Sequence, residues 1–252
     1  SRSKMFISDG NVKIKVKRYL ANNSKETGTI IICHEFGLNM LSTARYARGL
    51  RRAGYNVFIF DFAGSGSGLS KGRRSTDMSV LTAKDDLKLV FEHVKKLDYV
   101  DPDKLILGGA SQGGFVTALF SAERKDEVQK MFLYYPAFNI PDDSKRGNII
   151  GTKIDPRNVP ESFMALGYVR LGKKYVIDAQ GLDPWNEIKK YDGPVLICHG
   201  TNDKLVPISY AHKALAVYKN AKLIEFKGAH HCFFMPWNVG KAVKETIEFL
   251  KE

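Results

Sequence analysis

Three scarcities limit what this 252-residue chain can be: it has three cysteines, no long uncharged apolar run and fewer acidic than basic residues. Cys33, Cys198 and Cys232 lack the short paired spacings of metal sites and disulfide scaffolds. We therefore expect no bound metal, and we expect a reducing compartment such as the cytoplasm. The N-terminal residues lack an apolar signal core, although a chain that begins with serine leaves export open.

No segment approaches the roughly 20 apolar residues that a membrane-spanning helix requires. The 39 Lys and Arg residues exceed the 27 Asp and Glu residues and give a formal charge of +12. Clustered basic residues would favour nucleic-acid binding, but here they form short groups along the chain, such as Arg51-Arg52 and Lys173-Lys174. We interpret them as solvated surface and expect neither a nucleic-acid nor a membrane partner. A non-catalytic basic binding module is the alternative from a different class.

The length, the hydrophobic fraction of 44% and the charged fraction of 26% fit one domain with a substantial core. Residues 12–19 alternate apolar and basic side chains, which predicts a strand with one solvated face at an edge of the sheet. Later apolar runs are short and unbroken, as in strands covered on both faces. These runs are 30–33, 57–60, 105–107, 131–134, 195–197 and 223–224.

Helical patterns alternate with these runs, which predicts a mostly parallel central sheet flanked by helices. The helices are expected over 42–53, 79–97, 112–124, 208–218 and 237–250. In such a fold, ligands bind at the carboxyl ends of the strands.

One interval departs from this alternation. Nearly sixty residues separate the strand that ends near residue 135 from the strand that begins near 194, about twice what a crossover helix requires. We therefore expect a small inserted lid or cap at about 138–186.

The first candidate for chemistry is Ser111, in the sequence Gly-Ala-Ser-Gln-Gly-Gly at 109–114. It follows an apolar run and precedes a helical pattern. This G-x-S-x-G context predicts a tight strand-to-helix turn that exposes the serine as a nucleophile.

A serine hydroxyl needs a base, and the base needs an acid that orients it. Asp203 follows the strand near 195–197, and the adjacent His230 and His231 follow the strand near 223–224. The residues alone leave open which histidine is the base. The order Ser, Asp, His matches the order of the triad in this type of fold.

Several segments resemble those of the serine α/β-hydrolases, and most closely those of the bacterial cinnamoyl or feruloyl esterases. They are 109–114, His-Gly-Thr-Asn-Asp-Lys-Leu-Val-Pro at 199–207, Gly-Ala-His-His-Cys-Phe at 228–233 and Tyr-Asp-Gly-Pro-Val at 191–195. The resemblance covers the whole chain and implies one α/β-hydrolase domain over 1–252. The catalytic histidine of that family is fourth in a G-x-x-H motif, which implies His231.

An oxyanion hole needs two backbone N–H groups. The amide of Gln112, next to the serine, is one candidate. The second should come from the loop after the first buried strand, where His-Glu-Phe at 34–36 resembles the His-Gly-Phe segment of the family. The resemblance implies the Phe36 amide, although Glu35 replaces the usual glycine.

The resemblance implies hydrolysis of hydroxycinnamoyl esters, which are small molecules. The residue patterns themselves imply no cofactor, because the chain has neither a P-loop lysine nor a metal-ligand set. The resemblance further suggests Asp142 and Tyr175 in the insertion as contacts for ring hydroxyls. A homodimer is a candidate assembly. A monoacylglycerol lipase or general carboxylesterase would use the same triad, and a serine peptidase is a further alternative. An epoxide hydrolase or dehalogenase would need an aspartate in place of Ser111.

Overall fold

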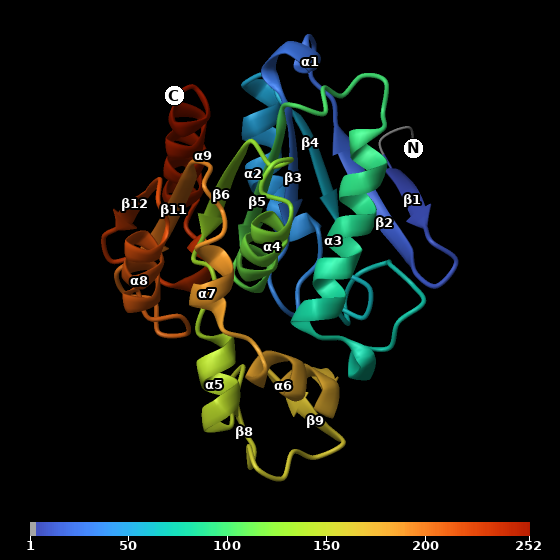
Figure 1. Ribbon diagram of the computed structural model, residues 1–252, viewed down its shortest axis with the longest axis vertical. Coiled ribbons are helices and arrows are strands. Elements are labelled where there is room, and N and C mark those ends of the chain that lie inside the picture. The colour runs from blue at the N-terminus through green and yellow to red at the C-terminus, as the bar shows by residue number, and fades with distance from the viewer. Residues whose placement is uncertain (1–3) are drawn as a thin grey trace.

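The computed structural model describes residues 4–252 and contains one eight-stranded sheet with the order β1-β2-β4-β3-β5-β6-β11-β12 (Figure 1). The strands from β4 to β12 pair in parallel, while β1 and β2 are antiparallel to their neighbours. This confirms the mostly parallel sheet. The strands are β1 Lys4–Ser8, β2 Lys13–Tyr19, β3 Thr29–Cys33, β4 Asn56–Phe60, β5 Leu105–Ala110, β6 Lys130–Tyr134, β11 Val195–Gly200 and β12 Ala221–Phe226.

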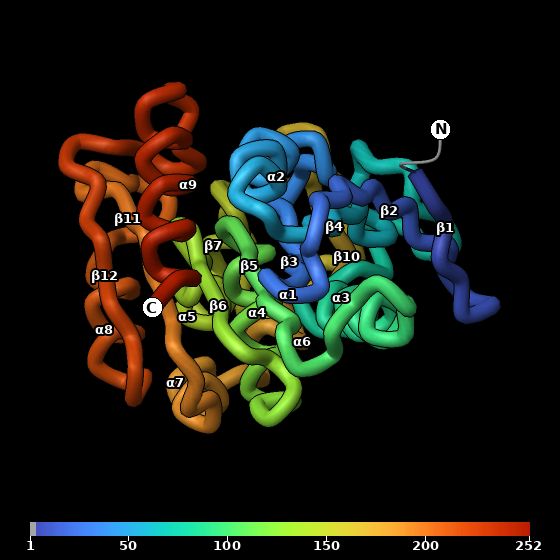
Figure 2. Tube along the Cα trace, turned by 90° about the horizontal axis from the view of Figure 1, so that it is seen from above, coloured from blue at the N-terminus to red at the C-terminus, as the bar shows by residue number. Residues whose placement is uncertain are grey.

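Helices cover both faces of the sheet (Figure 2). The helices α2 (Leu41–Arg52) and α9 (Pro236–Leu250) pack on one face, and α3 (Val80–Lys95), α4 (Gln112–Glu123) and α8 (Ser209–Val217) pack on the other. The side chains of β3 alternate between the two resulting cores, with Ile30 and Ile32 in one and Ile31 in the other. The five expected helices are confirmed to within two residues at each end. The short helices α1 (Ser24–Thr27), η1 (Ser75–Asp77) and η2 (His231–Phe233) lie in loops.

The prediction that residues 12–19 form an edge strand was wrong. The strand β2 pairs with β1 on one side and with β4 on the other. The preceding strand β1 has mostly exposed or half-buried side chains and occupies the edge. The partly exposed side chains of β2 therefore do not reflect a missing neighbour.

The segment between β6 and β11 lies beyond the carboxyl ends of the parallel strands (Figure 1). It contains several short elements, and two pairs of them form small antiparallel sheets. The elements are α5 Ile140–Arg146, β7 Asn148–Ile149, β8 Thr152–Lys153, β9 Ser162–Ala165, β10 Val169–Gly172, α6 Lys173–Gln180 and α7 Pro184–Ile188.

Candidate active site

Ser111 lies in the turn between β5 and α4, with φ 52° and ψ −120°. This backbone conformation is strained for a residue with a side chain. Two glycines make the turn possible. A Cβ atom at Gly109 would lie 2.3 Å from the Gly113 carbonyl oxygen, and one at Gly113 would lie 2.3 Å from that of Cys33. The small residues thus let the N-terminus of α4 approach the loop after β3.

Ser111, His231 and Asp203 form a continuous chain of short contacts. The Ser111 Oγ atom lies 2.8 Å from Nε2 of His231, and Nδ1 of the same ring lies 2.7 Å from Oδ2 of Asp203. A carboxylate only accepts hydrogen bonds, so Nδ1 carries the proton and Nε2 can accept from the serine. His230 is exposed and lies instead within reach of the Asn202 amide.

The Asp203 carboxylate is held from several sides. Its Oδ1 atom accepts from the amides of Leu205 and Val206, and its Oδ2 atom lies 3.2 Å from Nε2 of the buried His199. Burial alone would raise the pKa of Asp203, but hydrogen bonds from His199 and His231 outweigh it and hold the pKa well below its ordinary value. Asp203 is therefore ionised at neutral pH.

Arg45, on α2, supports the loop that follows His231. Its guanidinium donates to the carbonyl oxygens of Cys232 at 2.5 Å and Phe233 at 2.7 Å. Both of these residues have positive φ, 71° and 43°. The sequence offers no local signal for this role, because Arg45 lies almost 190 positions from Phe233.

Tyr135 packs directly against the ring of His231. The two rings meet edge to face, with centroids 4.9 Å apart. The Tyr135 hydroxyl lies 2.9 Å from that of Tyr46, and it is 3.2 Å from Nη2 of Arg45. Sequence reasoning missed Tyr135, since it lies in the turn after β6 without a recognisable motif.

Glu35 and Phe36 lie in the loop after β3. Glu35 is buried, and its Oε1 atom accepts from the Ser42 hydroxyl at 2.7 Å. Its carboxylate is thus occupied by partners on α2. Among residues 4–252, no hydrogen bond uses the Phe36 amide. The amide of Gln112 is in the first turn of α4, where N–H groups have no partner within the helix.

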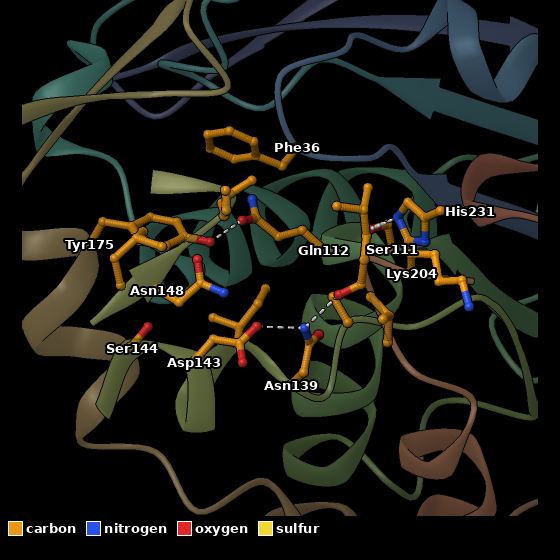
Figure 3. Close-up of a pocket in the computed structure, with 17 residues that line it drawn as sticks. Phe36, Ser111, Gln112, Asn139, Asp143, Ser144, Asn148, Tyr175, Lys204 and His231 are labelled. Atoms are coloured by element: carbon orange, nitrogen blue, oxygen red, sulfur yellow. Dashed lines mark hydrogen bonds between the residues drawn. The ribbon is translucent and has the colours of Figure 1, made fainter. Parts of the chain in front are cut away.

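A cavity adjoins Ser111 and His231 (Figure 3). Phe36, Ile140 and Ile149 contribute apolar surface to its lining, while Asp143, Ser144 and Asn148 add polar groups. Figure 3 shows Asp143 and Asn148 on the side away from His231.

Of the two residues expected to contact ring hydroxyls, Tyr175 lines this cavity and Asp142 does not. Tyr175 donates its hydroxyl hydrogen bond to Oε1 of Gln112 at 2.6 Å. Asp142 accepts from the Tyr210 hydroxyl at 2.9 Å. On helix α5 the next residue, Asp143, faces the cavity, because successive residues of a helix point about 100° apart. Asp142 therefore lies outside the cavity lining, and its contact with a ring hydroxyl stays a prediction.

Asp143 is partnered by Asn139 and Arg146. The Asn139 amide donates to Oδ2 of Asp143 at 2.7 Å, and the Arg146 guanidinium donates to Oδ1. Burial raises the pKa of Asp143 above its ordinary value, although the hydrogen bonds from Arg146 and Asn139 act in the opposite direction.

Solved structures with the same fold support the class of this protein. Est1E from Butyrivibrio proteoclasticus, in a structure with bound ferulic acid, has a TM-score of 0.89 and 29% identity, covering 98% of this chain and all of that one. A monoacylglycerol lipase from Paleococcus ferrophilus has a TM-score of 0.71 at 22% identity, covering 94% of this chain and 98% of its own. The protein is a serine hydrolase of the α/β-hydrolase class.

The sequence model of one family in this class, described as serine aminopeptidase S33, matches residues 24–162. The chain belongs to this family. It is also 20% identical over 283 residues to the quorum-quenching protein AidA of Acinetobacter baumannii strain MDR-ZJ06, covering 94% of this chain and 91% of AidA.

Proposed function

We propose that this hydrolase is a serine esterase that cleaves carboxylic esters through an acyl-enzyme and prefers hydroxycinnamoyl groups. The observation that carries the proposal is the pair of contacts that links Ser111 to His231 at 2.8 Å and His231 to Asp203 at 2.7 Å. This geometry permits transfer of the serine proton to the imidazole. Ser111 is the proposed nucleophile, His231 the base and Asp203 the residue that orients it.

In the proposed reaction, Nε2 of His231 takes the Ser111 proton while Oγ attacks the ester carbonyl carbon. The tetrahedral intermediate collapses, and the departing alkoxide takes the proton from the imidazolium. A water molecule, deprotonated by His231, then attacks the acyl-enzyme. The carboxylic acid leaves and Ser111 recovers its proton.

The amides of Phe36 and Gln112 are the proposed oxyanion hole. Within residues 4–252, neither N–H group has a backbone partner, and the close approach at Gly113 brings the N-terminus of α4 against the loop after β3. Two preorganised donors stabilise the charge that develops on the carbonyl oxygen. The partial positive charge at the start of α4 adds to this effect.

The cavity supports an aromatic acyl group with a hydroxyl substituent. Phe36, Ile140 and Ile149 offer an apolar lining for a ring, and Asp143 offers an acceptor for a phenolic O–H. The similar Est1E has been crystallised with ferulic acid, which carries such a hydroxyl.

The test is hydrolysis of methyl ferulate, p-nitrophenyl acetate and a long-chain p-nitrophenyl ester by the wild type and by Ser111→Ala. We expect Ser111-dependent activity that favours ferulate, reduced about 10⁴-fold or more in the variant. Activity confined to long acyl chains would support a lipase instead. Cleavage of short peptide amides would support a peptidase, as the family description names. Retained activity in Ser111→Ala would overturn the mechanism.

A further inference from the structure

Five large apolar side chains are exposed close to the cavity. Leu205 lines the cavity itself, and the others lie at the first residues of α2 and α9 or just before α9. We call Leu41, Leu205, Phe234, Met235 and Trp237 the apolar ridge, and their exposed fractions are 61%, 57%, 74%, 50% and 69%. Single exposed apolar residues are ordinary, whereas a group of them marks a surface that contacts something.

Contacts within the structure bring the three chain segments of the ridge together. Leu205 and His231 line the same cavity, and Phe234 is three residues beyond His231. Arg45, one helical turn after Leu41, donates to the Phe233 carbonyl oxygen at 2.7 Å. The helices α2 and α9 lie side by side (Figure 2). A Cβ atom at Gly49 would lie only 2.6 Å from the side chain of Val243, so the two helices pack closely.

The same three segments contain no acidic residue. Residues 36–60, 204–224 and 226–244 hold eleven Lys and Arg residues and none of the 27 Asp and Glu residues of the chain. The carboxylates that flank the first two segments, Glu35 and Asp203, are buried. Glu225, between the other two, is paired with His212 at 2.9 Å. The exposed charges on these three segments are therefore basic, at residues such as Arg48, Lys204, Lys227, Lys241 and Lys244.

The positive charge and the exposed apolar side chains together decide which kind of partner fits this surface. A second copy of the chain would bring one positive surface against another, which disfavours self-association here. A nucleic acid would satisfy the positive charge but would leave the aliphatic ridge residues without an apolar partner. A bilayer with anionic headgroups satisfies both, because aromatic and aliphatic side chains insert at the interface while Lys and Arg contact the headgroups.

We propose that the apolar ridge and the basic residues around it form a docking surface for an anionic lipid bilayer. Among the described residues, no helix is long and apolar enough to cross a bilayer. The proposed contact is peripheral, and it turns Leu205, which lines the cavity, toward the lipid. This departs from the expectation of no membrane partner, which followed from the lack of a long apolar run. The fold gathers exposed apolar residues that are dispersed in the sequence. The proposal is independent of the proposed esterase activity.

Trp237 provides a direct probe of this surface. The chain has two tryptophans, so Trp185→Phe leaves Trp237 as the only one. In the Trp185→Phe/Ser111→Ala background, which avoids lipid turnover, we expect a blue shift of the fluorescence with vesicles of phosphatidylcholine and phosphatidylglycerol. We expect no shift with pure phosphatidylcholine, and we expect added salt to reverse the shift.

Sedimentation of full-length variants with vesicles tests which surface binds the bilayer. We expect Phe234→Ser/Met235→Ser and Lys241→Glu/Lys244→Glu each to weaken partitioning at least tenfold. Phe6→Ser on β1 and Lys88→Glu/Lys96→Glu on or just after α3 are the controls, since these exposed residues lie away from the ridge. Circular dichroism checks that each variant is folded.

Several results would overturn the proposal. They are an absence of binding to anionic vesicles, equal binding to neutral vesicles, and control variants that weaken binding as much as ridge variants. Salt-sensitive binding to RNA or DNA with no binding to vesicles would point to nucleic acid as the partner. A concentration-dependent dimer that the Phe234→Ser/Met235→Ser variant abolishes, again without vesicle binding, would point to a second copy.

Discussion

The Arg45 guanidinium lies 3.5 Å from the Glu35 carboxylate and also donates to the carbonyl oxygens of Cys232 and Phe233. The pair thus joins the loop that carries Phe36 to the loop that carries His231. The proposed base, His231, and one proposed oxyanion donor, the Phe36 amide, lie in these two loops. The ion pair therefore helps to hold both groups in position.

We expect Arg45→Lys to lower kcat/KM about tenfold or more, because an ammonium cannot span both carbonyl oxygens and the His231 loop would shift. The measurement is steady-state kinetics on the best ester from the substrate panel. Arg48→Lys, one turn further along α2 and exposed, is the control. Unchanged kinetics in Arg45→Lys would show that the strained residues 232–233 hold their conformation without the guanidinium.

Asp143 and Asp142 form a matched pair for substrate selectivity. We expect Asp143→Ala to lower the preference for methyl ferulate over methyl cinnamate, which lacks ring hydroxyls, by about tenfold, the effect of about one lost hydrogen bond. Asp142→Ala should leave this ratio unchanged, because Asp142 contacts Tyr210 outside the cavity. An unchanged ratio in Asp143→Ala would remove Asp143 as the hydroxyl acceptor.

The lowered pKa of Asp203 predicts that the free energy of unfolding depends on pH. Its pKa is lowered in the folded protein, so the folded state favours the ionised carboxylate more than the unfolded state does. The resulting stabilisation is present above the unfolded pKa, about 3.9 for aspartate, and is lost as the pH falls through the lower folded value. We therefore expect Asp203→Asn to be less stable than the wild type at pH 7, with a difference that shrinks below about pH 4.

Denaturant unfolding at pH 7, 5 and 3 measures this difference. The exposed Asp98 is the control, and Asp98→Asn should change the free energy of unfolding little at any pH. A constant difference between Asp203→Asn and the wild type across this range would contradict the assignment.

His199 is expected to hold the Asp203 carboxylate. His199→Phe keeps an aromatic ring but removes the N–H that faces Oδ2 of Asp203, and we expect a loss of about 1–3 kcal/mol of unfolding free energy. Activity should fall as well, because the carboxylate that orients His231 becomes more mobile. His212→Phe, at a half-exposed position on α8, is the control. Equal stabilities of the two variants would argue against this role.

We expect alanine at Gly113 to lower the stability of the fold and alanine at Gly240 to raise it. A Cβ atom at Gly113 would overlap the carbonyl oxygens of Cys33 and His34, so we expect a loss of about 1–3 kcal/mol of stability and a lower kcat. A Cβ atom at Gly240, inside α9, would meet nothing within 4 Å, and we expect a gain of about 0.5–1 kcal/mol. Thermal unfolding distinguishes the two, and a stabilised Gly113→Ala would contradict the close approach.

Much of the fold could be predicted because its signals are local. The unbroken apolar runs and the periodic helices are set by which residues must leave water, and each signal spans only a few positions. The edge of the sheet could not be predicted in this way. Whether β2 has a neighbour depends on β1, whose five residues carry little pattern of their own.

The candidate site shows the same division between what local sequence signals determine and what tertiary packing determines. The residue order by itself determined the candidates Ser111, Asp203 and His231, because each sits in a turn whose small residues and preceding strand are read locally. The residues alone left His230 and His231 open, and the family resemblance implied His231, which the structure places 2.8 Å from Ser111. Only the tertiary structure decided that Asp143 rather than Asp142 faces the cavity, and that Arg45 and Tyr135 support the histidine. These relationships join residues far apart in the chain or depend on the rotation of one helix, and packing across the whole domain fixes them.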